Sequence, residues 1–105
     1  MRKSRFVSFE WCESAFEQEV YLSADGSVTA LGETRIVRRT INTPSQSAAV
    51  MAALWSVESW LECGGSLASA LDGLAHLAIP SPLKPIVEAL HALEIQVREP
   101  ARGAA

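Results

Sequence analysis

The segment NTPSQSAAVMAALWSVESWLECGGS, residues 42–66, decides the fold because the hydrophobic pattern changes within it from strand-like to helical. Thr43 suits the N-cap of a helix, Pro44 its first turn and Gln46 the capping-box position, so several backbone N–H groups gain partners at once. Apolar side chains then recur every three or four residues until two adjacent glycines end the helix. The buried stripe expected on this helix consists of Val50, Leu54, Val57 and Leu61.

Upstream of this helix, apolar and polar residues alternate with a period of two, which is typical of half-buried strands. The Asp25-Gly26 pair predicts a two-residue type I′ hairpin, which needs a positive φ at both positions. The sequence LGET at residues 31–34 predicts a further turn. We therefore expect an antiparallel meander of three or four strands, near residues 7–11, 16–22, 27–31 and 34–41.

Downstream, the pattern predicts two more helices. Ser66 suits the N-cap of the second helix. The segment IPSPLKP, residues 79–85, then interrupts the pattern because prolines 80, 82 and 85 are not expected inside a helix. The third helix ends before Pro100. The expected stripes are Leu67, Leu71, Leu74 and Ala78 on the second helix, and Ile86, Leu90, Leu93 and Val97 on the third.

Together these patterns predict the α+β class, with an N-terminal antiparallel β-meander followed by three helices packed on the sheet or on one another. We expect a single domain over residues 1–105. Residues 1–42 form the meander, residues 43–98 the helical half and residues 99–105 a frayed tail.

The composition favours a globular protein with a real core. The chain has 105 residues, of which 49% are hydrophobic, and a net charge of −3. No apolar run approaches the roughly 18 residues that span a bilayer. Polar residues also interrupt the first apolar run, so no signal peptide is expected. We therefore expect a cytoplasmic protein without a membrane partner.

Two tryptophans of the first helix are the strongest functional signal. Trp55 and Trp60 are five residues apart, so they point about 140° apart and one buried stripe cannot cover both. Trp55 shares its side of the helix with Met51, and Glu58 and Glu62 surround it. A methionine and a tryptophan inside a rim of carboxylates are typical of a partner-binding surface. The alternative is that the third helix or the first strand covers Trp55.

The third helix carries a second apolar outlier. Ile95 points away from Leu90 and Val97 on the helical wheel. If it joined Trp55 in one patch, a two-fold axis would bury that patch twice. This hypothesis predicts a homodimer.

A basic cluster near the end of the meander is the remaining charged feature. In a regular strand Arg35 and Arg39 share one face and Arg38 takes the other, so an ordinary solvated face is expected. Contact with an anionic partner is the alternative. Nucleic acid is not an expected partner, because residues 44–105 carry three basic and six acidic side chains.

No residue pattern points to an enzyme or to a metal site. The chain has none of the common phosphate, dinucleotide or nucleophile motifs. Cys12, Cys63, His76 and His91 lack the short spacing of zinc ligands. We therefore expect no catalytic residues, no metal and no cofactor.

The interpretation that remains is a small non-enzymatic module that docks on a larger protein and modulates or inhibits it, as an inhibitor, an adaptor or an anti-defence protein of a mobile element. The sequence predicts Met51, Trp55, Glu58, Glu62 and Ile95 as its partner-binding residues. The alternative is a small-ligand or enzymatic pocket between sheet and helices, lined by Trp11, Tyr21 and Trp60.

Overall fold

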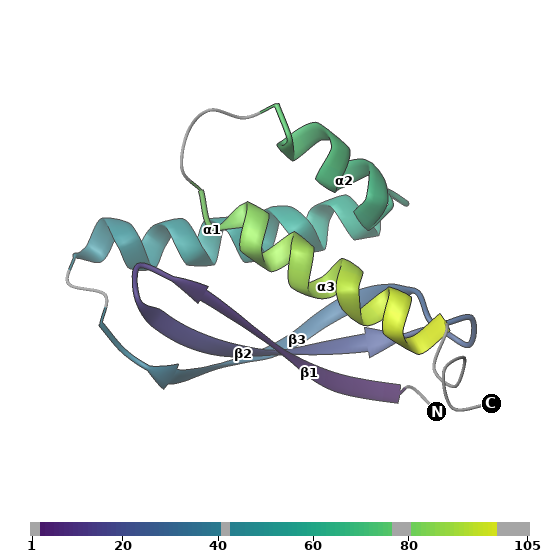
Figure 1. Cartoon of the computed structure of the whole chain (residues 1–105), viewed down its shortest axis with the longest axis horizontal. Helices are drawn as coiled ribbons and strands as arrows, with labels where there is room; N and C mark the ends of the chain where they lie inside the picture. The colour runs from purple at the N-terminus through teal and green to yellow at the C-terminus, as the bar shows by residue number, and fades with distance from the viewer. Residues whose placement is uncertain (1–2, 41–42, 77–80, 99–105) are drawn as a thin grey trace.

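The computed structural model describes residues 3–40, 43–76 and 81–98, and it has three strands followed by three helices (Figure 1). The elements are β1 (Lys3–Trp11), β2 (Ser14–Leu22), β3 (Val28–Arg38), α1 (Pro44–Glu62), α2 (Leu67–Leu74) and α3 (Leu83–Arg98). The strands form an antiparallel sheet in the order β1-β2-β3. The α+β class and the order of meander and helices are thereby confirmed.

The helices cover one face of the sheet in two layers. Helix α1 packs against β3 and α3 packs against β1, while α2 lies above them and packs against α3 (Figure 1). The central strand β2 alternates strictly between buried and half-buried positions, as its sequence predicts. Its inward side chains, Ser14, Phe16, Gln18, Val20 and Leu22, are all buried under the helices.

The turn expected at residues 31–34 does not form, and β3 runs through it as one strand of 11 residues. Gly32 and Glu33 together lie opposite Glu19, so the extra residue makes a β-bulge instead of a turn. A side chain at residue 32 would collide with the carboxylate of Glu19, which accepts the N–H of Glu33 at 3.1 Å. The buried Gln18 amide donates to the carbonyl of Gly32 at 3.0 Å. Glycine beside a polar residue favours a bulge and a turn alike, which explains the wrong prediction.

The type I′ hairpin expected at Asp25-Gly26 is also wrong. Residues 23–27 form a longer loop, in which Gly26 has a φ of +88° and Asp25 does not have a positive φ. The N–H of Gly26 donates to the Ser23 carbonyl at 3.0 Å. An added Cβ at Gly26 would lie 3.0 Å from Val97 on α3, so glycine serves both the backbone conformation and the packing of α3.

The two-residue hairpin occurs between β1 and β2. Cys12 and Glu13 have φ values of +51° and +67°, which are unfavourable for residues with a side chain. Their carbonyl oxygens accept hydrogen bonds from the Thr40 hydroxyl at 3.0 Å and from Nε of Arg38 at 2.9 Å. The end of β3 therefore stabilises this strained hairpin.

The predicted helix signals are largely confirmed. Thr43 and Gln46 form both bonds of the capping box, and Ser66 caps α2 through the N–H of Ser69. Pro85, however, lies inside α3, where the first-turn N–H groups need no helical partner. Pro80 and Ala78 lie outside the described residues. Within the described ranges, none of the helices combines the length and apolarity that crossing a bilayer requires.

A buried carboxylate ties α3 to the sheet. Glu94 is 8% exposed, and its Oε2 accepts the N–H of Val28, the first residue of β3, at 2.8 Å. This bond supplies a partner for a backbone N–H at the end of the sheet. It also fixes the register of the helix against the strand.

Candidate functional site

The flank of α1 beside β3 carries two large exposed side chains. Met51 is 63% exposed and Trp55 is 71% exposed, although both lie on a helix that packs on the sheet. They are four residues apart and therefore lie one above the other on the same side of the helix. The structure thus leaves Trp55 outside the core, and neither α3 nor β1 covers it.

A groove runs from this flank to β3. It has a volume of about 460 Å³, and Met51 lines it together with Ile36 of β3, which is 50% exposed. Phe16 and Val50 form its apolar floor, while Arg39 lies at its rim. We use the name docking face for Met51, Trp55 and Ile36.

Of the other predicted partner-binding residues, Glu58 and Glu62 lie on the same helix as this face, whereas Ile95 lies on α3. Glu58 is half-buried and Glu62 is exposed, and both lie on α1 at wheel angles close to that of Trp55. Ile95 is 48% exposed but lies on α3, which packs over β1 at the opposite edge of the sheet. Ser56 and Trp60 of α1 face α2 and α3 across a common pocket, so Trp55, about 100° and 140° away on the wheel, points away from these two helices. The docking face and Ile95 are therefore separate surfaces.

The second tryptophan has a structural role. The Nε1 of Trp60 donates to the carbonyl oxygen of Ser66 at 2.8 Å, across the turn between α1 and α2. Its ring lies directly over Gly65, where any side chain would collide with it. Trp60 is 43% exposed. The indole thus fixes the path of the chain from α1 into α2.

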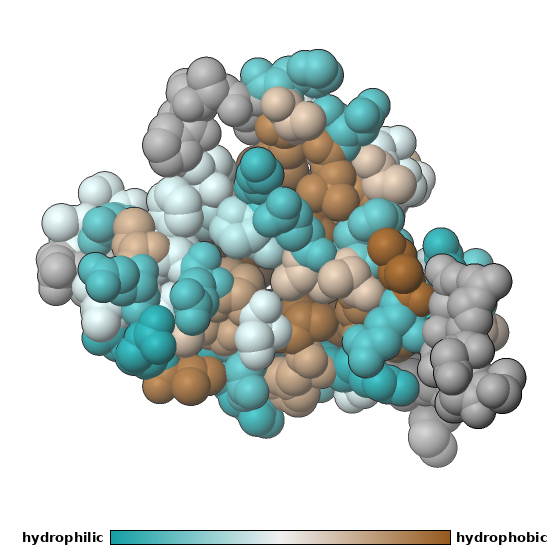
Figure 2. Space-filling model, in the orientation of Figure 1, coloured by the Kyte–Doolittle hydropathy of each residue, from teal (hydrophilic) through white to brown (hydrophobic). Residues whose placement is uncertain are grey.

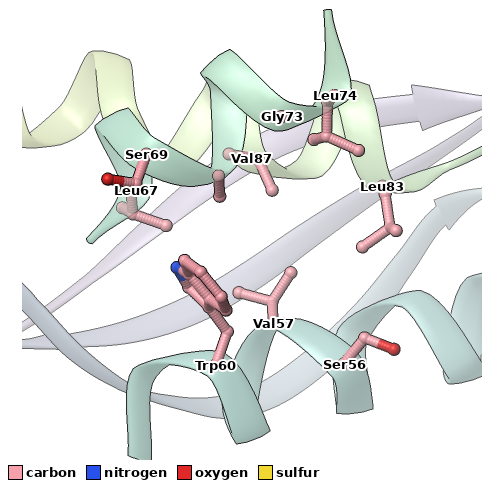
Figure 3. Close-up of a pocket in the computed structure, with 10 residues that line it drawn as sticks. Ser56, Val57, Trp60, Leu67, Ser69, Gly73, Leu74, Leu83 and Val87 are labelled. Carbon is pink, nitrogen blue, oxygen red and sulfur yellow. The ribbon is translucent and has the colours of Figure 1, made fainter. Parts of the chain in front are cut away.

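Trp60 also forms one wall of a pocket among the three helices (Figure 3). The pocket has a volume of about 310 Å³. Figure 3 shows the ring and Val57 on one side, with side chains of α2 and α3 facing them. In Figure 2 the apolar surface gathers over this part of the molecule, around α2. Among the described residues, its lining is Ser56, Val57, Trp60, Leu67, Ser69, Ala70, Gly73, Leu74, Leu83 and Val87.

This pocket differs from the one expected between sheet and helices. Tyr21 lies on the outer face of the sheet, where its hydroxyl donates to Glu19 at 3.3 Å. Trp11 packs against the edge of the core, on β1. The structure therefore separates these two residues from Trp60.

The three arginines divide between the two faces of the sheet in an unexpected way. A bulge at Val37 shifts the register, so Arg35 and Arg38 both lie on the outer face and Arg39 lies on the inner side. Arg35 stacks over the ring of Phe6 at 4.2 Å, while Arg38 pairs with Glu10 at 3.6 Å. The prediction that Arg35 and Arg39 share a face is wrong because it assumed a regular strand.

The histidines and cysteines do not converge within the described part of the chain. No group of three or more His, Cys, Asp or Glu side chains there could hold a metal ion. Cys63 is exposed, and Cys12 is half-buried, with its sulfur 3.4 Å from the amide nitrogen of Gln46. His91 is half-buried in a shallow depression beside Asp72, while His76 is exposed. Helix α2 thus packs beside His91.

Comparisons with protein-family models, with curated proteins and with solved structures found no match to this chain.

Neither the contact region of Ile36 beside Met51 nor the pocket among the helices was predicted from the sequence. The only signal for Ile36 was its place in an apolar pair, Ile36-Val37, at the end of β3. The pocket depends on how far α2 stands from α1, which no sequence pattern specifies.

Proposed function

We propose that the protein is a small docking module that binds a larger protein through the docking face and modulates it. One observation carries this proposal: Trp55 is 71% exposed on a helix whose other large apolar side chains are mostly covered. Tryptophan and methionine are enriched at the centres of protein interfaces, where they supply a large contact area at a small cost in conformational entropy.

The exposed area is sufficient for a hot spot. With 71% of the side chain exposed, Trp55 offers about 150 Å² to a partner. At about 25 cal/mol per Å², covering this area contributes up to about 4 kcal/mol to binding. Met51 and Ile36 add further apolar area at either side of the groove.

The geometry favours docking by side chains over pairing along the edge of β3. β3 departs from regular register at three places along its pairing with β2. Such bulges twist an edge away from a flat template and prevent an added strand from pairing continuously. The groove between α1 and β3 instead accepts a protruding apolar side chain of the partner.

The test compares capture of a partner by wild-type protein and by two variants. Trp55→Ala is expected to lower the affinity for the purified partner by at least thirtyfold, while far-UV circular dichroism stays unchanged. Ile95→Ala is the control, because it removes another exposed apolar side chain from a different helix. If Trp55→Ala and Ile95→Ala bind like the wild type, the docking face is not the interface.

The same comparison tests the expected homodimer. Sedimentation of the wild type at micromolar concentration gives a dimer if the protein docks on a second copy of itself. Ile95 and Trp55 lie on separate surfaces, so their substitutions distinguish the two possible dimer contacts. The substitution that converts the dimer to the 11.3 kDa monomer identifies the surface that forms the contact.

A further inference from the structure

We infer that the pocket among α1, α2 and α3 binds a neutral, planar aromatic small molecule of about two fused rings. The pocket lies on the side of α1 that faces α2, whereas the docking face lies on the side that faces the β3 edge. The inference therefore does not depend on the proposed docking function.

The size of the pocket sets the size of the ligand. An engineered apolar cavity of about 150 Å³ holds one benzene molecule. The volume of about 310 Å³ is twice that, and it falls at the lower end of the range of small-molecule sites. A bicyclic ligand fills this space, whereas a single ring leaves half of it empty.

The lining sets the charge and polarity of the ligand. Its described side chains are aliphatic apart from the Trp60 indole and the hydroxyls of Ser56 and Ser69, and none of these described side chains carries a charge. A charged ligand would lose its hydration without gaining a charged partner. The two serines lie on α1 and α2, and a serine hydroxyl both donates and accepts hydrogen bonds. A ligand with a single hydroxyl group therefore finds a hydrogen-bonding partner in the lining.

Trp60 sets the preference for a planar ring. Its Nε1 is engaged by Ser66 at 2.8 Å, and the ring is confined by Gly65 on the turn side. The indole is thus held in one orientation before any ligand arrives, and Figure 3 shows it facing the pocket. A fixed aromatic wall favours an offset-stacked aromatic ligand over a flexible aliphatic chain.

Gly73 provides a variant that fills the pocket without disturbing the core. It lines the pocket on α2, and a Cβ added there meets no atom within 4 Å. Gly73→Leu is expected to place its side chain in the ligand space. Ala68→Leu adds a similar side chain at an exposed position of the same helix and is the matched control.

The experiment is a titration of the full chain with 2-naphthol, followed by ¹H–¹⁵N correlation spectra. We expect saturable shifts of the Trp60 indole N–H and of the Gly73 amide, with binding weakened at least tenfold by Gly73→Leu and unchanged by Ala68→Leu. The charged analogue 2-naphthoate should bind at least tenfold more weakly than 2-naphthol.

Three outcomes overturn the inference. They are the absence of saturable shifts up to the solubility limit, equal binding by Gly73→Leu and wild type, and shifts that centre on Met51 and Ile36 instead of Trp60. Trp55→Ala should bind 2-naphthol like the wild type. A failure of the docking proposal therefore stays distinguishable from a failure of this one.

Discussion

Replacing Trp60 is expected to destabilise the protein more than replacing Trp55. Because Trp60 is 43% exposed, the fold covers about 130 Å² of it, which corresponds to about 3 kcal/mol at 25 cal/mol per Å². Loss of the bond from its Nε1 to Ser66 adds about 1 kcal/mol. Trp60→Ala should therefore lower the free energy of unfolding by about 3–4 kcal/mol. For Trp55→Ala, with 71% of the residue already exposed, the fold covers about 65 Å², so the expected loss is about 1.5 kcal/mol.

Urea denaturation followed by far-UV circular dichroism measures both effects without relying on tryptophan fluorescence. With an m-value of about 1.5–2 kcal/mol/M, Trp60→Ala should lower the midpoint by about 2 M and Trp55→Ala by about 1 M. Trp60→Phe keeps most of the ring but loses the N–H, so its midpoint should fall between those of the wild type and Trp60→Ala. Equal midpoints for Trp60→Ala and Trp55→Ala would refute the assignment of Trp60 as the residue that fixes the turn.

Two further predictions concern Glu94 on α3, which accepts the N–H of the first residue of β3, and Asp25 in the loop between β2 and β3. Glu94→Ala should lower the free energy of unfolding by about 1–3 kcal/mol because the buried N–H of Val28 loses its acceptor, whereas Glu94→Gln keeps an acceptor oxygen and should lose less. Equal urea midpoints for these two variants would contradict this. The Ser23 hydroxyl, then the N–H of Ser27, and to a smaller extent the charge of Arg98 lower the pKa of Asp25 from 3.8 to about 2. A lowered carboxyl pKa stabilises the fold above the unfolded value of 3.8, and this contribution is lost as the pH falls towards 2. An NMR titration should show the Asp25 midpoint near 2 in the wild type and closer to 3.8 in Ser23→Ala, and a wild-type midpoint near 4 would contradict the prediction.

The sequence predicts well those features that depend on neighbouring residues. The alternation along β2 and the capping box at Thr43 are local, since each is defined within a few positions of the chain. Both are found where they were expected. The sequence favoured Trp55 as an exposed tryptophan but left open whether the third helix or the first strand covers it, because a wheel angle does not show which side of α1 receives the second layer of helices.

The wrong predictions have a common cause in long-range contacts. The bulge at Gly32 is stabilised by Gln18 and Glu19 on the neighbouring strand, so the glycine alone could not distinguish it from a turn. The hairpin at Cys12 and Glu13 has no glycine or asparagine, and its positive φ values persist because the end of β3 binds its carbonyl groups. In each case, a residue distant in sequence decides the local conformation.

The short helix α2 connects the stability of the fold with the pocket. A helix of eight residues is unstable alone. Among the residues of α2, Leu67 is the one that is buried. Ala70, Leu71 and Leu74 pack against the core only in part, and further support comes from the N-terminal end, where Ser66 caps the helix and receives the Trp60 N–H. The ring that holds this end is also the wall of the pocket, so a ligand stacked on Trp60 would contact α1 and α2 together. Such a ligand would supply the apolar contacts that the short helix lacks, which is why binding there should stabilise α2 more than any strand of the sheet.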